Sequence, residues 1–310
     1  MVSPVKVLVP DDLGVKVLGE SPALAAIRYE PGAVWPADGH DAEVVVVGFD
    51  NAAAVGAHLA ELPRLRLVQT LNAGYEQWLP WIPPGVALSN GRGAHGGSSA
   101  EWVVAALLNI FRDLRSFGDQ QAAGVWEHRS TETLIGKRVV ILGAGDLAVN
   151  LAARLAPFET EVTLVGRRPR AGVRALDDLA DLLPRADVLV AMLPADASTY
   201  RLVDGAVLAQ LPDGAVVVNA GRGGAIHTDA LLAELTSGRL RAALDVTDPE
   251  PLPPGHPLWS APGLLITPHV AGSTEGAEER AWLVARTQIE RHAAGGIPSN
   301  VVAGPGAAPE

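Results

Sequence analysis

The fold of this chain is decided by Val139-Val-Ile-Leu-Gly143-Ala-Gly145-Asp-Leu-Ala148, in which an apolar strand runs into a glycine turn and then a helix. The first glycine permits the tight turn, the second lets a pyrophosphate approach the backbone, and the third position needs a small residue so that helix and strand can pack. Glycine also ends strands for structural reasons alone. With a strand before it and a helix after it, however, the turn is better interpreted as a dinucleotide site formed by Gly143, Ala144, Gly145, Asp146 and Leu147.

The end of the following strand, Val162-Thr-Leu-Val-Gly166-Arg167-Arg168, bears on which dinucleotide is bound. An NAD site usually has a carboxylate here for the ribose hydroxyls, whereas an arginine can pair with the 2′-phosphate of NADP. Position 166 is glycine and two arginines follow it, so the pattern favours NADP(H) over NAD(H). A solvated basic turn is the alternative. The negative charge of Asp146, close to the expected pyrophosphate, is unexplained by the sequence.

Length and composition limit the class of protein. The 310 residues exceed the roughly 100–200 of one domain, so we expect two domains. A net charge of −11 opposes nonspecific binding to nucleic acid or an anionic membrane. The chain has no cysteine, which excludes disulfides, a thiolate nucleophile and cysteine metal sites, and we expect no metal. Apolar runs end well before the ~18 residues of a membrane span, so we expect a soluble, cytoplasmic protein.

Short β-branched runs alternate with alanine- and leucine-rich helical stretches along the whole chain. This alternation predicts an α/β fold in which two parallel sheets, one after the other in sequence, are covered by helices on both faces. The expected strands are Val5–Val9, Val44–Val47, Leu67–Thr70, Ala87–Ser89, Val139–Leu142, Val162–Val165, Val188–Leu193, Val216–Asn219, Ala242–Asp245 and Leu264–Thr267.

A glycine-rich segment, Gly91-Arg-Gly-Ala-His-Gly-Gly-Ser-Ser99, marks the boundary between the two expected domains. A long helix from Ala100 to about Phe117 is expected after it. The chain is expected to cross back within a helix over Thr274–His292, because the strand-like tail after it is too short to form a domain. We therefore expect one discontinuous domain, residues 1–95 and 286–310, and a second domain, residues 96–285.

Three chemically active side chains follow strands in the second half of the chain. Arg222 ends Val216-Val-Val-Asn-Ala-Gly-Arg222, Glu250 lies in Asp245-Val-Thr-Asp-Pro-Glu250, and His269 lies in Leu264-Leu-Ile-Thr-Pro-His269. Ligands of open α/β sheets bind at the carboxyl ends of strands, so these side chains can converge on one molecule. Taken singly, Arg222 could be an exposed residue that caps a helix, and Glu250 and His269 could be ordinary turn residues. Together they indicate an anion clamp with an acid/base pair.

These motifs, in this order, resemble the D-isomer-specific 2-hydroxyacid dehydrogenase family, in its glyoxylate/hydroxypyruvate reductase-like branch. The resemblance runs in register from about Thr133 to Val302 and more loosely through Leu71-Asn-Ala-Gly74-Tyr75. It implies a Rossmann coenzyme-binding domain, a flavodoxin-like substrate-binding domain and a homodimer. The motifs that carry it are Gly143-Ala-Gly145, Leu193-Pro194, Val218-Asn-Ala-Gly-Arg222-Gly-Gly, Leu244-Asp-Val-Thr-Asp-Pro-Glu250-Pro-Leu and Thr267-Pro-His269-Val-Ala-Gly-Ser-Thr274.

The resemblance also implies a role for each site residue. Arg222 would bind the substrate carboxylate and carbonyl oxygen, and His269, kept protonated by Glu250, would give a proton to that oxygen as hydride arrives. Trp126 lies where some members of the family send a loop into the neighbouring subunit. The coenzyme side would further include Leu193, Pro194, Thr199, Asn219, Ala220, Asp245 and Gly272, and the substrate side would include Ala73, Gly74, Tyr75, His95 and Trp259.

The expected reaction is the NADPH-dependent reduction of a small 2-keto acid, such as glyoxylate, hydroxypyruvate or pyruvate, to the D-2-hydroxy acid. Oxidation of phosphite or of phosphoglycerate on the same scaffold is an alternative. Formate oxidation is disfavoured because formate dehydrogenases carry glutamine at the position of Glu250. An alternative from another class is a non-catalytic, nucleotide-sensing corepressor that binds partner proteins.

Overall fold

The computed structural model describes residues 3–48 and 52–307, and the chain divides into two compact units. One unit comprises residues 1–95 and 275–310, and the other comprises residues 96–274. The expected second boundary, between residues 285 and 286, falls inside helix α9 (Ala277–Ala293). Because Trp282, Ala285 and Ile289 of this helix are buried against the strands of the first unit, the whole helix belongs to that unit.

The second unit is built on a seven-stranded parallel sheet with the strand order β12-β11-β10-β9-β6-β7-β8. The order reverses between β6 and β9, which is the position where open α/β sheets bind ligands. Its strands are β6 (Arg138–Leu142), β7 (Glu161–Gly166), β8 (Val173–Ala175), β9 (Val188–Ala191), β10 (Val216–Asn219), β11 (Arg241–Leu244) and β12 (Leu264–Ile266). Its helices are α3 (Gly96–Phe111), α4 (Leu114–Ala123), α5 (Asp146–Leu155), α6 (Leu179–Leu182), α7 (Gly205–Ala209) and α8 (Thr228–Thr236).

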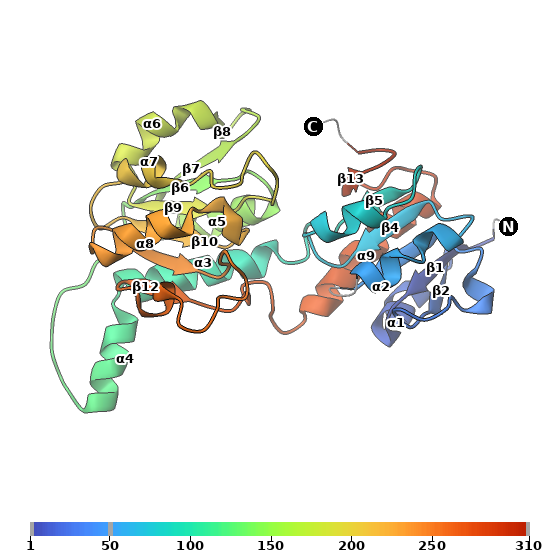
Figure 1. The fold of residues 1–310 in the computed structure, drawn as a ribbon, viewed down its shortest axis with the longest axis horizontal. Coiled ribbons are helices and arrows are strands. Elements are labelled where there is room, and N and C mark those ends of the chain that lie inside the picture. Colours follow the sequence, from blue (N-terminus) through green and yellow to red (C-terminus); the bar gives the residue numbers. More distant parts are fainter. Residues whose placement is uncertain (1–2, 49–51, 308–310) are drawn as a thin grey trace. The chain divides into compact units, whose positions relative to one another are not determined.

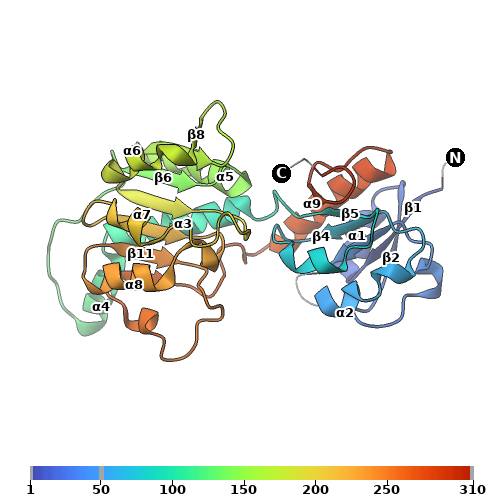
Figure 2. The same cartoon turned by 45° about the horizontal axis from the view of Figure 1, so that its top comes forward.

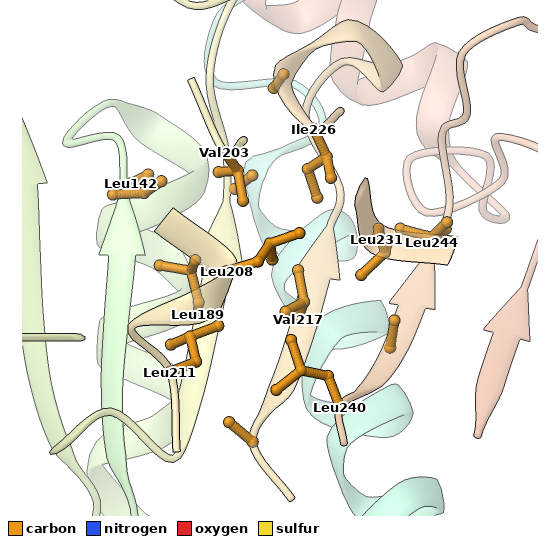
Figure 3. Packing of buried hydrophobic residues seen from close by; sticks show 14 of the residues in the cluster. Leu142, Leu189, Val203, Leu208, Leu211, Val217, Ile226, Leu231, Leu240 and Leu244 are labelled. Carbon is orange, nitrogen blue, oxygen red and sulfur yellow. The ribbon is translucent and has the colours of Figure 1, made fainter. Parts of the chain in front are cut away.

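Both faces of this sheet are buried, which explains why its central strands are continuously apolar. Alternate residues along each strand enter different cores, because successive side chains of a strand point to opposite faces. Leu142, Leu189 and Val217 pack with α7 and α8 on one face, as Figure 3 shows. Ile141 and Val218 pack with α3 and α5 on the other face.

The first unit has a six-stranded sheet with the order β13-β5-β4-β3-β1-β2. The chain returns to this unit through α9, and β13 joins the edge of the sheet antiparallel to β5, while the other neighbouring strands are parallel. Figure 1 shows α9 and β13 in red among the blue and cyan elements, and Figure 2 shows α9 there from another direction. The strands are β1 (Val5–Val9), β2 (Leu24–Arg28), β3 (Val44–Val47), β4 (Leu67–Thr70), β5 (Ala87–Ser89) and β13 (Val301–Ala303), and the other helices are α1 (Asp12–Gly19) and α2 (Ala52–Gly56).

The α/β class with two mostly parallel sheets agrees with the expectation from sequence. The expected single helix from Ala100 to Phe117 is wrong, because α3 begins at Gly96 and the chain breaks at Asp113, whose φ of 56° is left-handed. The helix that follows, α4, has no buried residue and extends away from the sheet of its unit (Figure 1). Within residues 3–48 and 52–307, no helix is both long and apolar enough to span a membrane.

Candidate active site

The candidate catalytic side chains lie beyond the carboxyl ends of three adjacent strands of the second unit. The register pairs Asn219 of β10 with Leu244 of β11, and Leu244 with Ile266 of β12, so the three strands end side by side. The main chain continues this alignment past the sheet, since the amide of Asp245 donates to the carbonyl of Asn219 at 3.0 Å. Loops that begin at these ends are therefore neighbours in space.

Arg222 is carried by a tight turn after β10 that Asn219 holds together. The Asn219 side-chain amide donates to the carbonyl of Arg222 at 2.9 Å, and its oxygen accepts from the amide of Gly221 at 3.1 Å. A Cβ on Gly223 would overlap the carbonyl of Thr247, so the turn lies in close backbone contact with the loop that leads to Glu250. Glycine at 223 is thus required by this close approach rather than by an unusual φ angle.

Arg222 also lines a cavity of about 300 Å³ within the second unit. The loop after β9 also lines this cavity, and in that loop the hydroxyl of Thr199 donates to the carbonyls of Pro194 and Asp196 at 2.7 and 3.0 Å. Thr199 therefore holds the shape of the loop. The cavity is lined by Pro194, Ala195, Asp196, Ala197, Thr199, Tyr200, Arg222, Gly224 and Ala225, so it joins three residues expected from sequence with others that were not expected.

His269 and Glu250 form a close pair, with the imidazole Nδ1 2.6 Å from the carboxylate Oε1. The side chains are 53% and 39% exposed, so the pair is accessible from solvent. Because Nδ1 faces the carboxylate, Nε2 is the ring nitrogen left to exchange a proton with a ligand. His269 has a φ of 54°, a left-handed conformation that costs energy for a residue with a side chain and is found at functional sites.

Asp245, which is only 2% exposed, holds the segment that carries His269. One carboxylate oxygen accepts from the Thr267 hydroxyl at 2.6 Å and from the Val270 amide at 2.8 Å, and the other oxygen accepts from the Ala271 amide at 2.9 Å. Its carbonyl also accepts from the amide of His269 at 2.8 Å. Asp245 therefore fixes the main chain on both sides of the histidine.

The glycine turn between β6 and α5 has the features that a pyrophosphate needs. Gly143 has a φ of 121° and its amide donates to the Val165 carbonyl, so the turn is tight and fixed. Gly145 precedes α5, and a Cβ there would meet no heavy atom within 4 Å, which leaves open space at the amino end of the helix. Open space beside helix amides suits a phosphate group.

The structure also accounts for the charge of Asp146. One oxygen accepts from the Asn150 side chain at 3.0 Å. The other oxygen is buried against Gly96 in the first turn of α3, where even a Cβ would overlap it. The amino end of α3 is positive by virtue of its aligned peptide dipoles and offsets this carboxylate.

Three arginines follow β7, where the 2′-phosphate is expected. Arg167 and Arg168 are exposed, and Arg167 Nη1 lies 4.0 Å from Asp196 Oδ2. Arg170 Nη2 donates to the carbonyl of Ala144 at 2.8 Å, so this side chain ties the arginine loop to the glycine turn. Asp196 remains ionised, because a hydrogen bond from the Ser198 hydroxyl holds the pKa of its carboxyl below the usual range.

Residues 104–271, more than half of the chain, match the family model described as "D-isomer specific 2-hydroxyacid dehydrogenase, NAD binding domain". The chain belongs to this family. Its members are oxidoreductases that act on the CH–OH group of their donors, and they bind a nicotinamide coenzyme.

Solved structures of the family share the fold over nearly the whole chain. A D-isomer specific 2-hydroxyacid dehydrogenase from Xanthobacter autotrophicus Py2, in complex with NADPH and MES, is 29% identical, with a TM-score of 0.83 and coverage of 97% of this chain and 98% of that one. An NADPH-dependent glyoxylate/hydroxypyruvate reductase from Sinorhizobium meliloti, in complex with NADP and sulfate, is 27% identical, with a TM-score of 0.78 and coverage of 96% and 98%.

A relative in sequence, the "Uncharacterized protein in proB 3'region" of Corynebacterium melassecola, is 43% identical over 145 residues. The match covers 45% of this chain and spans about half the length, 48%, of that relative.

The residues expected to bind the substrate are divided between the two units. Ala73, Gly74 and Tyr75 follow β4 in the first unit, and His95, which is half-buried, ends the first of the two segments that form that unit. Trp259 belongs to the second unit, is 55% exposed, and donates from Nε1 to the carbonyl of Pro253 at 2.9 Å. The other residues expected on the coenzyme side, Leu193, Ala220 and Gly272, lie in loops after β9, β10 and β12.

Sequence reasoning missed three residues that contact candidate site residues or the loops that carry them. They are Asp196 and Arg170 near the coenzyme arginines, and Asn90, which holds the loop after β4 through the Ala73 carbonyl. The Asp-x-Ser-Thr sequence at 196–199 is typical of a turn that is stabilised by side-chain hydrogen bonds, so Asp196 could have been predicted from the sequence. Among the described residues, no group of three or more His, Asp or Glu side chains could hold a metal ion.

Proposed function

We propose that the protein reduces a small 2-keto acid to the D-2-hydroxy acid with NADPH. The observation that carries the proposal is the pairing of His269 with Glu250 at 2.6 Å, in the unit in which Arg222 lines a cavity and Gly145 leaves open space at the amino end of α5. An acid/base pair and an anion-binding arginine are the groups that carbonyl reduction of a keto acid requires.

Each side chain has a distinct task in this reaction. The Arg222 guanidinium binds the carboxylate and carbonyl oxygen of the substrate, which orients the keto group and polarises it. His269 gives a proton from Nε2 to the carbonyl oxygen, while Glu250 accepts a hydrogen bond from Nδ1 and compensates the positive charge of the ring. When bound, the coenzyme supplies the hydride. Reversal of the same proton transfer serves oxidation of the hydroxy acid.

The NADP(H) preference rests on the arginines after β7. A glycine at 166, where NAD sites usually have an acid, leaves the exposed Arg167 and Arg168 as partners for a 2′-phosphate. The relatives from Xanthobacter autotrophicus and Sinorhizobium meliloti, whose solved structures contain NADPH and NADP, support this choice. The glycine turn, with Asn219, Asp245 and the loop 193–199, completes the proposed coenzyme site.

Glyoxylate and hydroxypyruvate are the substrates we propose first. The Sinorhizobium meliloti relative is described as a glyoxylate/hydroxypyruvate reductase, which supports that choice. The main-chain amides of Ala73 and Gly74 are proposed to bind the substrate carboxylate, and Tyr75, His95 and Trp259 are proposed to shape the pocket.

A homodimer is proposed from the exposed apolar surface of α4 and the segment after it. Leu114 is 54% exposed, Val125 51% and Trp126 98%, and α4 has no buried residue. A second copy covering this segment would bury that surface, and Trp126 could then reach the neighbouring subunit. Light scattering after size exclusion should give twice the mass of one chain, and Trp126→Ser should lower the dimer affinity.

The proposed activity is tested by following NADPH and NADH oxidation with glyoxylate, hydroxypyruvate, pyruvate, 2-ketobutyrate and phenylpyruvate. We expect turnover with NADPH and a loss of about 10²–10⁴-fold in kcat for His269→Ala, the contribution typical of a positioned acid. Asp204→Asn, a change at an exposed helix cap outside the site, is the matched control. Reduction of NADP by phosphite instead would assign a different reaction. NADPH binding without turnover of any compound would contradict the reductase proposal.

A further inference from the structure

The loop after β4 in the first unit presents two adjacent main-chain N–H groups that no protein group occupies. In the described parts of the chain, the amides of Ala73 and Gly74 donate no hydrogen bond. The next amide is different, because Tyr75 donates to the carboxylate of Glu76 at 2.9 Å. Successive N–H groups in a turn form a concave site for an anion. The loop therefore offers two donors, and the third is already used.

Each of these two N–H groups belongs to a peptide whose carbonyl oxygen accepts a hydrogen bond from a buried side chain. A carbonyl and the following N–H share one rigid peptide plane, so fixing the oxygen also fixes the direction of the N–H. The carbonyl of Asn72, whose peptide contains the Ala73 amide, accepts from the Thr70 hydroxyl and from the Gly91 amide, both at 2.7 Å. The carbonyl of Ala73, whose peptide contains the Gly74 amide, accepts from the Asn90 side chain at 2.7 Å.

The holding groups are rigid because the strands beneath them are paired. Gln69 and Ser89 are partners in the parallel register of β4 and β5, so Thr70 and Asn90 are the next residues at the same edge of the sheet. Thr70 is fully buried and Asn90 is 6% exposed. A Cβ on Gly91 would overlap the carbonyl of Leu71, so the two loops are in backbone contact.

Asn90 is itself fixed by the segment that returns to the first unit. The Asn300 side chain, which is only 5% exposed, donates to the carbonyls of Asn90 and Arg92 at 3.1 and 2.8 Å. The side-chain oxygen of Gln288 in α9 accepts from the main-chain amide of Asn300 at 3.2 Å. The orientation of the Ala73–Gly74 peptide is thus tied, through Asn90, to α9 and the C-terminal strand.

We infer that Thr70 and Asn90 are positioning residues, which aim the Ala73 and Gly74 amides at the carboxylate of the substrate. The inference rests on the proposed function, because it takes the bound anion to be a 2-keto acid. Hydrogen bonds to the two carbonyls also polarise their peptides, which strengthens the N–H groups as donors. Neither residue contacts the reacting atoms. They act on the KM for the keto acid rather than on the chemical step.

The test compares Thr70→Val and Asn90→Ala with the parent in steady-state kinetics. Thr70→Val removes the one side-chain hydrogen bond of Thr70, and Asn90→Ala removes the bond to the Ala73 carbonyl together with the one that Asn90 accepts from the Arg92 amide. We expect the KM for glyoxylate to rise about 3- to 10-fold in each variant, with kcat and the KM for NADPH within twofold. Thr70→Ser keeps a hydroxyl and should restore the parent KM. Tyr29→Phe is the matched control, because it removes a buried hydroxyl that donates to the carbonyl of Val46 at 3.0 Å in the same sheet.

A second readout is independent of turnover. In amide spectra of deuterated, ¹⁵N-labelled protein, oxalate should shift the signals of Ala73 and Gly74 in the parent, with half-saturation at a concentration several-fold higher in Thr70→Val. If the parent reduces no 2-keto acid but oxalate shifts these signals in this manner, the reductase proposal fails while the positioning role stands. If oxalate leaves both signals unmoved, or if the KM values of both variants match that of Tyr29→Phe, the positioning role is overturned.

Discussion

Replacement of Asp245 by asparagine should destabilise the protein through one identifiable mismatch. The carboxylate receives three hydrogen bonds, two at one oxygen and one, from the Ala271 amide, at the other. Asparagine retains an oxygen for the first pair but presents an NH₂ group to the Ala271 N–H, so two donors face each other in a site that is 2% exposed. Loss of a hydrogen bond to a charged group and isolation of a buried donor cost about 2–4 kcal/mol of unfolding free energy.

Urea unfolding, followed by circular dichroism, measures this loss. With a dependence of about 3 kcal/mol per molar urea, the midpoint of Asp245→Asn should lie roughly 1 M below that of the parent. Turnover should fall as well, because the same contacts hold the main chain of His269. Asp204→Asn is the matched control, since asparagine caps a helix as well as aspartate does and the midpoint should stay the same. Equal midpoints for Asp245→Asn and Asp204→Asn would refute the holding role of Asp245.

Three further predictions concern other parts of the second unit. Gly223→Ala places a Cβ against the backbone of the neighbouring loop, so the unfolding free energy should fall by about 1–3 kcal/mol and turnover should drop. Gly19→Ala is the control and should not lower stability, because its Cβ would meet nothing within 4 Å. Ser198→Ala removes the hydrogen bond that lowers the pKa of the Asp196 carboxyl. This hydrogen bond stabilises the folded protein above the ordinary pKa of 3.8, and the stabilisation is lost as the pH falls through the lowered pKa. The urea midpoint of this variant should therefore lie below that of the parent at neutral pH, with a difference that shrinks on acidification; a difference that grows would contradict the sign. Arg167→Ala should raise the KM for NADPH about 10-fold and leave the KM for NADH unchanged, and equal changes in both would exclude a 2′-phosphate contact.

The sheet of the second unit could be predicted from local sequence because its strands are buried on both faces. Residues 139–142 and 216–218 are continuous apolar runs, and such runs followed by glycine turns leave few other interpretations. The strands that sequence reasoning missed, β2 and β8, lie at the edges of their sheets, where fewer residues are buried and the apolar signal is weaker.

The parts that could not be predicted depend on contacts between distant segments. Asp146 looked misplaced beside a pyrophosphate because the first turn of α3, against which its carboxylate is buried, lies fifty residues earlier in the sequence. The break after α3 depends on the left-handed conformation of Asp113, which no local pattern announced. The hydrogen bonds of Asn90 reach Asn300, so the positioning of the loop after β4 becomes visible only when the chain has returned to its first unit. The cytoplasmic location stays a prediction.

Transfer of deuterium from the coenzyme to the product tests the central proposal most directly. The protein would be incubated with NADPH deuterated at the transferable position of C4 and with hydroxypyruvate, and the product analysed by chiral chromatography and mass spectrometry. Deuterium at C2 of the D-hydroxy acid, lost together with turnover in Arg222→Ala, is the predicted result. The L-isomer as product, or unlabelled product, would contradict the account.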